Sequence, residues 1–318
     1  MTINSKIIAT GSYLPEKILT NFDLEKIVDT TNDWIIERTG IKQRHIVAQG
    51  EFTSDIATKA ALKALSNSGL KAEEIDMIIL ATTTPDLTFP ATATTVQAKI
   101  NAKNAFAFDL QAVCCGFVYA VTTANNFIKS GQVKNALIIG AETLSRIVDW
   151  KDRNTCVLFG DGAGAVVLQA TSEDRGIIAS NLHSDGKLNG ILKTSGGVST
   201  SNTGFIKMSG KEVFKHAVEK MTKSVLTVLE SSNLGVKDID LLVPHQANAR
   251  ILSAVATRLG IAEEKVVITL QNHANTSAAS IPLALDHANS QGRIKKDDII
   301  VLEALGGGLT WGSVVLKW

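Results

Sequence analysis

Short apolar segments alternate with amphipathic segments along the whole chain. The apolar segments are rich in β-branched residues and are apolar on both faces of a pleat, which is typical of strands covered on both sides. Four of them are IIATG (7–11), MIILA (77–81), LIIGA (137–141) and AVVLQ (165–169). Residues 55–68 and 214–232 instead carry apolar side chains at helical spacing. The pattern therefore predicts an α/β protein.

The order of these segments is repeated in the two halves of the chain. Residues 66–86 resemble residues 230–248, because in both an amphipathic helix ends in a turn, an Ile-Asp pair follows, and an apolar strand comes next. Asp76 and Asp240 are equivalent in this comparison. Further matches in the same order join 5–11 with 175–181, 130–140 with 290–303, and 162–169 with 311–318. We expect two similar halves, 1–172 and 173–318, with a site where they meet.

The segment AFAFDLQAVCCGFVYA (105–120) carries the first candidate for chemistry. A predicted strand over 105–110 leads into a helix that begins near Cys114. The positive end of a helix dipole lowers the pKa of a thiol, which favours a reactive thiolate at Cys114. Cys115 lies about 100° further round the helix and would point elsewhere. An inert buried thiol is the alternative for each cysteine.

Three further motifs follow predicted strands. PHQAN places His245 after the strand at 239–243, at the sheet edge where α/β proteins bind ligands. ITLQNHANTSAAS (268–280) holds the position in the second half that matches the cysteine segment, with Asn275 roughly in the place of Cys114. Taken singly, His245 is most often structural and Asn275 an N-cap. EALGGGLTWGS (303–313) lacks the Lys-Ser/Thr of a phosphate loop, so we expect a loop that offers a backbone N–H.

Composition narrows the function classes. The chain carries 32 Lys+Arg against 31 Asp+Glu, so no excess positive charge attracts a nucleic acid. Three cysteines, two of them adjacent, form neither a disulfide framework nor a metal-binding spacing. The uncharged run 110–128 contains polar residues, which favours a buried helix over a membrane span. No signal peptide is visible at the N-terminus, so we expect a cytosolic protein.

Together the motifs Cys-x-Gly-Phe, Pro-His-Gln-Ala-Asn, Asn-Thr-Ser-Ala-Ala-Ser and Gly-Gly-Gly-x-Thr-Trp-Gly-Ser resemble the β-ketoacyl-acyl-carrier-protein synthase III family, over essentially the whole chain. The resemblance implies the thiolase fold, an α/β fold of duplicated halves in α-β-α-β-α layers. It implies that Cys114 is acylated by a short acyl-CoA, acetyl-CoA by default. Decarboxylative condensation with malonyl-acyl carrier protein then starts fatty acid synthesis. No cofactor, metal or membrane is implied, because acyl-CoA is a substrate.

The same resemblance implies roles for individual residues. His245 and Asn275 would stabilise the enolate formed on decarboxylation, and the N–H groups of Cys114 and Gly307 would form an oxyanion hole. Trp34 and Arg153 would hold the coenzyme A adenine between them. The remaining implied contacts are Thr30, Arg38, Gly210, Phe214, Ala247 and Asn248 with pantetheine, Phe89 and Leu305 with the acyl group, and Gln246, Arg250, Lys215 and Arg258 with acyl carrier protein. Phe89 would reach the neighbouring subunit of a homodimer.

Three positions depart from the family pattern: Ala274, Cys115 and Leu305. Other functions also remain open at this stage. A condensing enzyme of secondary metabolism would use the same three residues with a different second substrate. A cysteine hydrolase also uses a Cys, a His and an Asn, although a nucleophile in an apolar segment fits an acyl tunnel better than a peptide cleft. A noncatalytic scaffold is the third alternative.

Overall fold

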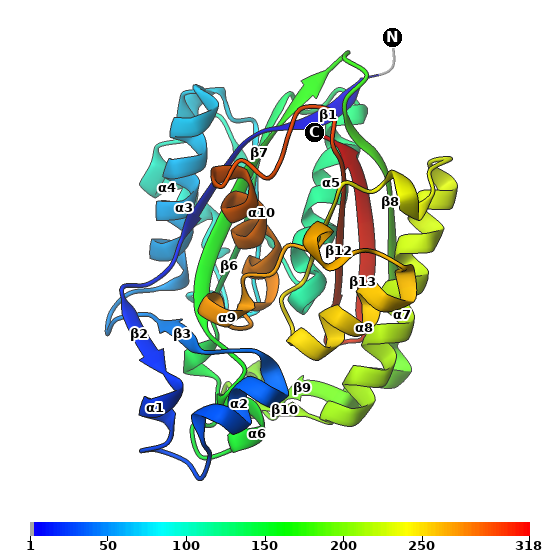
Figure 1. The fold of residues 1–318 in the computed structure, drawn as a ribbon. Helices are drawn as coiled ribbons and strands as arrows, with labels where there is room; N and C mark the ends of the chain where they lie inside the picture. Colours follow the sequence, from blue (N-terminus) through cyan, green and yellow to red (C-terminus); the bar gives the residue numbers. More distant parts are fainter. Residues whose placement is uncertain (1–2) are drawn as a thin grey trace.

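The computed structural model describes residues 3–318, and its two main sheets share one strand order (Figure 1). The first sheet runs β1 (Asn4–Tyr13), β7 (Asp161–Thr171), β6 (Asn135–Thr143), β4 (Met77–Ala81) and β5 (Phe106–Leu110). The second runs β8 (Gly176–Ser184), β13 (Thr310–Lys317), β12 (Ile299–Gly306) and β11 (Leu241–Pro244). In both, two antiparallel pairs are followed by a parallel pair. The counterpart of β5 is reduced to one parallel bridge between Leu242 and Val266.

The predicted duplication is confirmed down to single side chains. The Asp76 carboxylate accepts hydrogen bonds from the backbone N–H groups of Lys134 and Asn135, at 2.8 and 2.9 Å, where β6 begins. The Asp240 carboxylate accepts one from Ile299 N, at 2.8 Å, where β12 begins. The two aspartates therefore fix equivalent strand starts. The expected boundary at 172/173 falls between β7 and β8 and stays a prediction as a domain division.

Helices cover both faces of each sheet, which gives the expected five layers (Figure 1). On the outer face of the first sheet lie α3 (Thr53–Ser68) and α4 (Thr92–Ile100), and outside the second lie α7 (Gly210–Ser231) and α8 (Ala249–Leu259). The middle layer holds α5 (Gly116–Lys129) and α10 (Ser280–Ser290). Because α5 packs against strands of both sheets, its side chains are buried almost all round, as the uncharged run predicts. No helix within 3–318 has both the length and the apolar character needed to cross a membrane.

Smaller elements form a cap at one end of the sheets (Figure 1). They are β2 (Lys17–Thr20), α1 (Asn21–Leu24), α2 (Asn32–Thr39), β3 (Gln43–Ile46), α6 (Arg153–Cys156), β9 (Leu192–Thr194), β10 (Ile206–Met208) and α9 (Leu270–His273). Arg44 on β3 is fully buried and donates to Leu19 O at 3.2 Å, Asn21 Oδ1 at 3.0 Å and Val157 O at 2.9 Å. The bond to Val157 attaches the paired strands β2 and β3 to the segment that follows α6.

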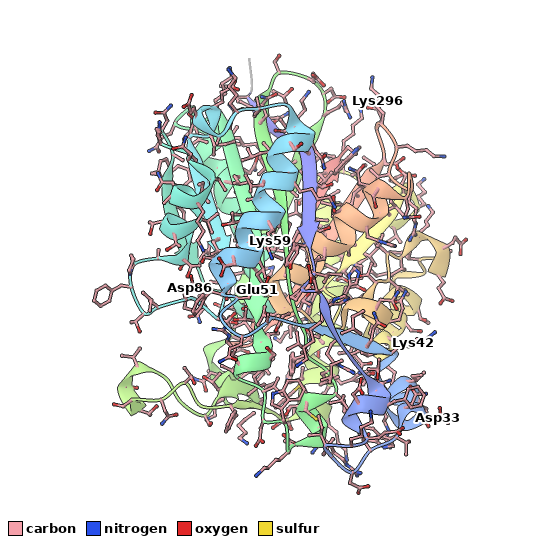
Figure 2. All side chains as sticks on the ribbon, turned by 90° about the vertical axis from the view of Figure 1, so that its left-hand side faces the viewer. Asp33, Lys42, Glu51, Lys59, Asp86 and Lys296 are labelled. Carbon is pink, nitrogen blue, oxygen red and sulfur yellow. The ribbon has the colours of Figure 1, made fainter. Side chains whose placement is uncertain are left out.

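Charges of opposite sign lie side by side near α3, where Figure 2 labels Glu51 and Lys59. Lys59 lies 2.8 Å from Glu51, and Lys99 lies 2.7 Å from Asp55. Each exposed pair of this kind contributes little to the stability of the fold. The paired charges instead leave this face near neutral.

The two halves touch through backbone at two glycines. A Cβ atom on Gly140 of β6 would overlap the carbonyl oxygen of Ala278, which lies in the 3₁₀ turn η8 (Ser277–Ala279) of the second half. A Cβ on Gly306 of β12 would lie 2.7 Å from the backbone nitrogen of Cys114, in the 3₁₀ turn η2 (Val113–Cys115) of the first half. Each half therefore presses a turn onto a strand of the other half.

Substitution Gly140→Ala is expected to destabilise the protein, because the added methyl group meets backbone atoms that have nowhere to move. Overpacking of this kind costs about 1–3 kcal/mol. Urea unfolding measures the loss. The matched control is Gly186→Ala, where a Cβ meets nothing within 4 Å, so its stability should stay within about 0.5 kcal/mol of wild type. Equal unfolding midpoints for the two variants would contradict the tight contact between halves.

Candidate active site

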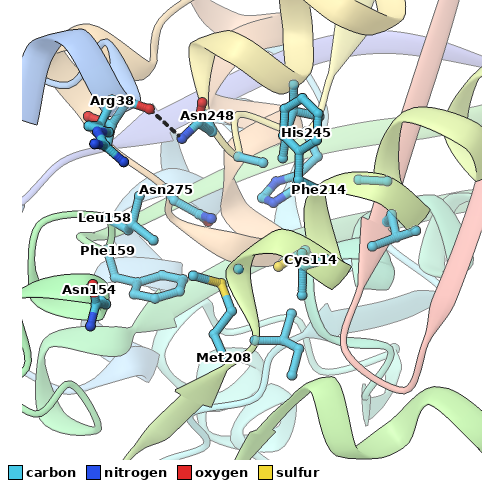
Figure 3. A pocket seen from close by; sticks show the side chains of 18 of the residues that line it. Arg38, Cys114, Asn154, Leu158, Phe159, Met208, Phe214, His245, Asn248 and Asn275 are labelled. Atoms are coloured by element: carbon cyan, nitrogen blue, oxygen red, sulfur yellow. Dashed lines mark hydrogen bonds between the residues drawn. The ribbon is translucent and has the colours of Figure 1, made fainter.

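Three residues singled out from the sequence meet in one cavity of about 240 Å³. Cys114 lies in η2 after β5, His245 directly follows β11, and Asn275 lies between α9 and η8. Figure 3 shows their side chains turned toward a common space. Cys114 comes from the first half, and His245 and Asn275 come from the second. The cavity therefore lies where the two halves meet, as expected from the sequence.

The Cys114 thiol is almost completely buried, at 5% exposed. Val113 before it has φ 51°, a left-handed backbone that β-branched residues rarely adopt, and α5 begins at Gly116, two residues after Cys114. Burial raises the pKa of Cys114 to about 12, and the charge of nearby Glu142 adds to that rise. The pKa shift is therefore opposite in direction to the one expected from a helix N-terminus, because the thiol is buried. Cys115 packs into the core between the sheets, as expected.

The ring of His245 is held in one tautomer. Its Nδ1 lies 2.7 Å from the hydroxyl of Ser280, and the same hydroxyl accepts from Gln246 N at 3.2 Å. Nδ1 is the one acceptor found for the Ser280 proton among the hydrogen bonds of residues 3–318, so Nδ1 accepts and the proton of the imidazole sits on Nε2. Burial lowers the pKa of His245 to about 3. His245 is thus a neutral N–H donor at neutral pH.

The amide of Asn275 is oriented by its own loop. Its Oδ1 accepts from Ser277 N at 2.9 Å, which leaves the amide N–H₂ group to donate. The backbone of Asn275 bridges to Phe159 and accepts from Gly160 N at 3.0 Å. Ala274 before it has φ 59°, a conformation that favours glycine, so the departure from the family pattern at this position is strained.

The structure corrects the alignment of the two halves at this point. A separation of 164 residues links Asp76 to Asp240, and the same separation links Val113 to Ser277, the first residues of η2 and η8. It also links the starts of α5 and α10. The counterpart of Cys114 is therefore Ala278, and the expected equivalence with Asn275 is wrong by three positions.

The cavity extends from Cys114 toward Trp34, and most positions expected to bind pantetheine line it. These are Arg38, Gly210, Phe214, Ala247 and Asn248, with Leu305 beside them. Asn248 caps α8 by accepting from Arg250 N at 2.8 Å, and it donates to Arg38 O at 3.0 Å (Figure 3). Thr30 is not among the lining residues. The cap helix α2 and the N-terminus of α8 therefore both border this cavity.

Two arginines lie over the ring of Trp34. The guanidinium carbon of Arg153 is 5.1 Å from the centre of the Trp34 ring, and that of Arg38 is 5.4 Å away. Both distances suit cation–π contact. A flat base between Trp34 and Arg153 would need a separation of roughly 7 Å, two van der Waals layers. Arg153 is half exposed, so its side chain has room to move outward.

A second cavity of about 170 Å³ lies on another side of Cys114. It is lined largely by apolar side chains from separate segments: Val113, Leu144, Ile147, Phe159, Leu192 and Ile206, with Thr83, Gln111, Lys193, Thr194 and Ser277. Leu305, expected in an acyl pocket, lines the first cavity instead, and Phe89 lines neither and is 82% exposed. Sequence reasoning missed this cavity because its residues are of ordinary core types.

The residues expected to dock a protein differ in exposure. Lys215, Arg250 and Arg258 are exposed, and Arg250 lies 5.9 Å from the ring of Phe214 at the cavity wall. Gln246 is only 1% exposed. Its amide donates to Val267 O at 3.0 Å and accepts from Thr269 N at 2.8 Å. The surface role expected for Gln246 is therefore wrong, because its side chain ties two buried loops together.

Sequence reasoning also missed Glu142, a fully buried carboxylate close to Cys114. The one signal for it is an acidic residue inside the apolar strand LIIGAET. The predicted Gly307 follows β12 in the glycine turn that leads to β13, next to Gly306.

Comparison with known proteins gives the family. Models described as 3-oxoacyl-[acyl-carrier-protein (ACP)] synthase III and its C-terminal part match residues 108–186 and 229–318. The β-ketoacyl-[acyl-carrier-protein] synthase III of Ehrlichia canis is 57% identical over 98% of this chain and 99% of its own.

Solved structures agree with that match. The 3-oxoacyl-[acyl-carrier-protein] synthase III of Aquifex aeolicus is 50% identical, with a TM-score of 0.95 over 99% of this chain and 100% of its own. A priming β-ketosynthase of the R1128 polyketide pathway is 32% identical, with a TM-score of 0.94 over 99% and 96%. The fold is therefore the thiolase fold expected from the sequence, and the chain belongs to the β-ketoacyl-[acyl-carrier-protein] synthase III family.

Proposed function

We propose that this chain starts fatty acid synthesis by condensing a short acyl group, taken from acyl-CoA, with malonyl-acyl carrier protein. The observation that carries the proposal is the shared cavity of Cys114, His245 and Asn275, in which a thiol faces two neutral N–H donors. The names of the full-length relatives support the same reaction. Acyl-CoA is a substrate in this scheme rather than a resident cofactor.

In the first step the sulfur of Cys114 attacks the thioester carbon of acyl-CoA, and coenzyme A leaves. The acyl group then waits on Sγ, in or near the second cavity. A buried thioester is protected from water, so the acyl-enzyme can persist until the second substrate arrives. The backbone N–H groups of Cys114 and Gly307 are proposed to hold the oxyanion of each tetrahedral intermediate.

In the second step malonyl-acyl carrier protein enters the first cavity and loses CO₂. His245 Nε2–H and the Asn275 amide donate to its thioester oxygen and stabilise the enolate. Neutral donors suit this role, because a charged imidazolium would be costly in so dry a site. The enolate carbon then attacks the acyl carbonyl on Cys114, which gives the 3-ketoacyl product.

The tautomer of His245 weighs against a cysteine hydrolase. A hydrolase needs the histidine to take the thiol proton at the nitrogen that faces the nucleophile. Here that nitrogen, Nε2, already carries a proton, because Nδ1 accepts from Ser280. A condensing enzyme of secondary metabolism is also less well supported, since identity is 57% to a fatty-acid relative and 32% to a polyketide one.

We further propose a homodimer formed along β5. This strand lies at the edge of the first sheet, so one row of its backbone groups has no neighbouring strand within 3–318. Phe106 on β5 is 41% exposed and stacks beside Phe108, which gives the edge an apolar surface. An exposed apolar edge strand pairs readily with a second copy. Phe89 is 82% exposed, so its ring is accessible to a partner subunit.

The expected cytosolic location stays a prediction.

Substitution Cys114→Ser should abolish acyl transfer from acetyl-CoA, because a serine hydroxyl in this site has no base strong enough to ionise it. Cys115→Ser is the matched control and should retain most of the activity, since Cys115 faces the core. Intact mass after incubation with acetyl-CoA measures the acyl label. Peptide mapping that finds the label on Cys115 would refute the assignment of the nucleophile.

Substitutions His245→Ala and Asn275→Ala should leave acylation of Cys114 largely intact but lower decarboxylation of malonyl-acyl carrier protein by roughly 10²–10³-fold each. Release of labelled CO₂ measures the second step separately from acylation. Decarboxylation at the wild-type rate in either variant would show that its N–H group does not stabilise the enolate.

We propose that the exposed Lys215 on α7 and Arg250 and Arg258 on α8 guide the acidic carrier protein. The double substitution Lys215→Glu/Arg258→Glu should raise the KM for malonyl-acyl carrier protein roughly tenfold, about 1.4 kcal/mol, without changing acylation by acetyl-CoA. Lys223→Glu, on the same helix as Lys215 but away from the first cavity, is the control. An equal change in KM for Lys223→Glu would point to net charge rather than to a local surface.

A further inference from the structure

A side-chain hydrogen bond joins the turn that carries Cys114 to the glycine turn of the other half. The hydroxyl of Thr310, the first residue of β13, donates to Ala112 O at 2.8 Å. The same hydroxyl lies 3.2 Å from Gly307 O, so its proton is shared between two carbonyl acceptors. Among the hydrogen bonds of residues 3–318, this is the one that connects residues 111–116 with residues 303–313. One hydroxyl therefore contacts the backbone of both turns.

The two N–H groups proposed for the oxyanion hole lie one peptide away from these acceptors. The N–H of Cys114 belongs to the peptide that follows the one with Ala112 O, and the N–H of Gly307 to the peptide that precedes the one with Gly307 O. Within residues 3–318 neither N–H donates to an acceptor, although both residues are buried. Buried N–H groups are almost always paired, so two unpaired ones in adjoining turns suit a ligand oxygen.

The two turns are in close contact along their backbones. A Cβ atom on Gly306 would lie 2.7 Å from Cys114 N and 2.9 Å from Ala112 O. A Cβ on Gly307 would lie 3.5 Å from Cγ2 of Val113. Because both glycines face the turn that carries the thiol, a shift of either turn would change the angle between the two N–H groups.

The turn that carries the thiol has a strained backbone. Val113 lies at φ 51°, and such a conformation persists only where the surroundings hold it. Ala112 O accepts from Cys115 N at 3.1 Å, which closes the turn from inside. The Thr310 hydroxyl holds the same carbonyl from outside, across the contact between the halves.

The glycine turn is anchored on its far side. Leu309 N donates to Asp185 O at 3.1 Å, and Leu309 O accepts from Asp185 N at 2.9 Å. The side chain of Leu309 is fully buried in the core outside the second sheet. The Thr310 hydroxyl therefore connects the strained turn to a segment that is itself fixed.

We propose that Thr310 is a positioning residue, whose hydroxyl holds the N–H groups of Cys114 and Gly307 at the spacing at which both donate to one oxyanion. The inference rests on the proposed function. It concerns the oxygen of the acyl group on Cys114, not the enolate oxygen held by His245 and Asn275. In this role Thr310 makes no contact with substrate and acts through the two backbone groups.

Acylation passes through that oxyanion. Sγ of Cys114 bonds to the thioester carbon, and an electron pair of the C=O bond moves to the oxygen, where the two N–H groups stabilise it. The pair then re-forms C=O as the bond to the coenzyme A sulfur breaks, and in the net reaction the thiol proton ends on that sulfur. Alkylation of the same thiol by iodoacetamide differs, because Sγ displaces iodide, the thiol proton passes to solvent, and no oxyanion forms.

The test compares these two reactions of Cys114 in the full-length enzyme. Thr310→Val keeps the shape of the side chain but removes the hydroxyl. Its maximal rate of acylation by acetyl-CoA, followed by rapid quench and intact mass, should fall by roughly 10–10²-fold, because the donors are misplaced. The acetyl-CoA concentration at half-maximal rate should change little, and alkylation of Cys114 by iodoacetamide, located by peptide mapping, should keep the wild-type rate.

Two further variants control for side effects of the substitution. Thr310→Ser keeps the hydroxyl and should acylate at close to the wild-type rate. The matched control is Thr222→Val on α7, which removes a hydroxyl that donates to Val218 O at 2.7 Å. Thr222→Val should leave both the acylation rate and the alkylation rate unchanged.

The outcomes separate this role from the proposed function. If wild-type Cys114 is not acylated by acetyl-CoA, the proposed function fails and the inference fails with it. If wild type is acylated and Thr310→Val is equally fast, or if acylation and alkylation slow together, the hydroxyl does not position the oxyanion hole. A slow Thr310→Ser would contradict the role as well. Should Thr310→Val fail to fold, as judged by circular dichroism, Thr310→Ala removes the same hydroxyl and is measured by the same two rates.

Discussion

The site depends on a reciprocal backbone contact between the two halves of the chain. The turn that carries Cys114 presses on Gly306 of the second sheet, and the turn that carries Ala278 presses on Gly140 of the first. Neither contact leaves room for a side chain. Contact this close buries the side chains that the turns carry, so the Cys114 thiol is desolvated on formation of the fold rather than on binding of substrate.

Desolvation then sets the protonation state of each group. It raises the pKa of Cys114 and lowers that of His245, so both are neutral at rest. A thiolate–imidazolium pair would place two charges in the same buried space, and burial disfavours the charged form of each group. The site therefore favours chemistry that uses neutral donors and keeps a thioester away from water. Decarboxylative condensation meets both conditions, whereas hydrolysis requires water at the acyl carbon.

The positions of Cys114 and His245 could be predicted because each follows a strand in a duplicated frame, whereas Asn275 follows the short helix α9. The apolar pattern alone predicts that His245 follows β11 and Cys114 follows β5, at the edge of each sheet where α/β proteins bind ligands. The direction of the Cys114 pKa shift could not be predicted from the sequence, since it depends on how deeply the opposite half buries the turn. The buried position of Gln246 could not be predicted from the sequence either. Its neighbours in PHQAN reach the cavity, but its own amide bonds with residues from the next loop, which no local pattern reveals.

The duplication also explains why the two turns differ in chemistry while sharing a backbone. Val113 and Ser277 open equivalent turns with φ 51° and 49°, and each turn leads directly into a central helix. Two like turns brought together by a pseudo-two-fold arrangement place their first residues close to the same space. One turn supplies the nucleophile at its second position, and the other supplies a hydroxyl at its first. A strained backbone conformation shared by both turns thus places Ser277 and Cys114 at the wall of the same second cavity.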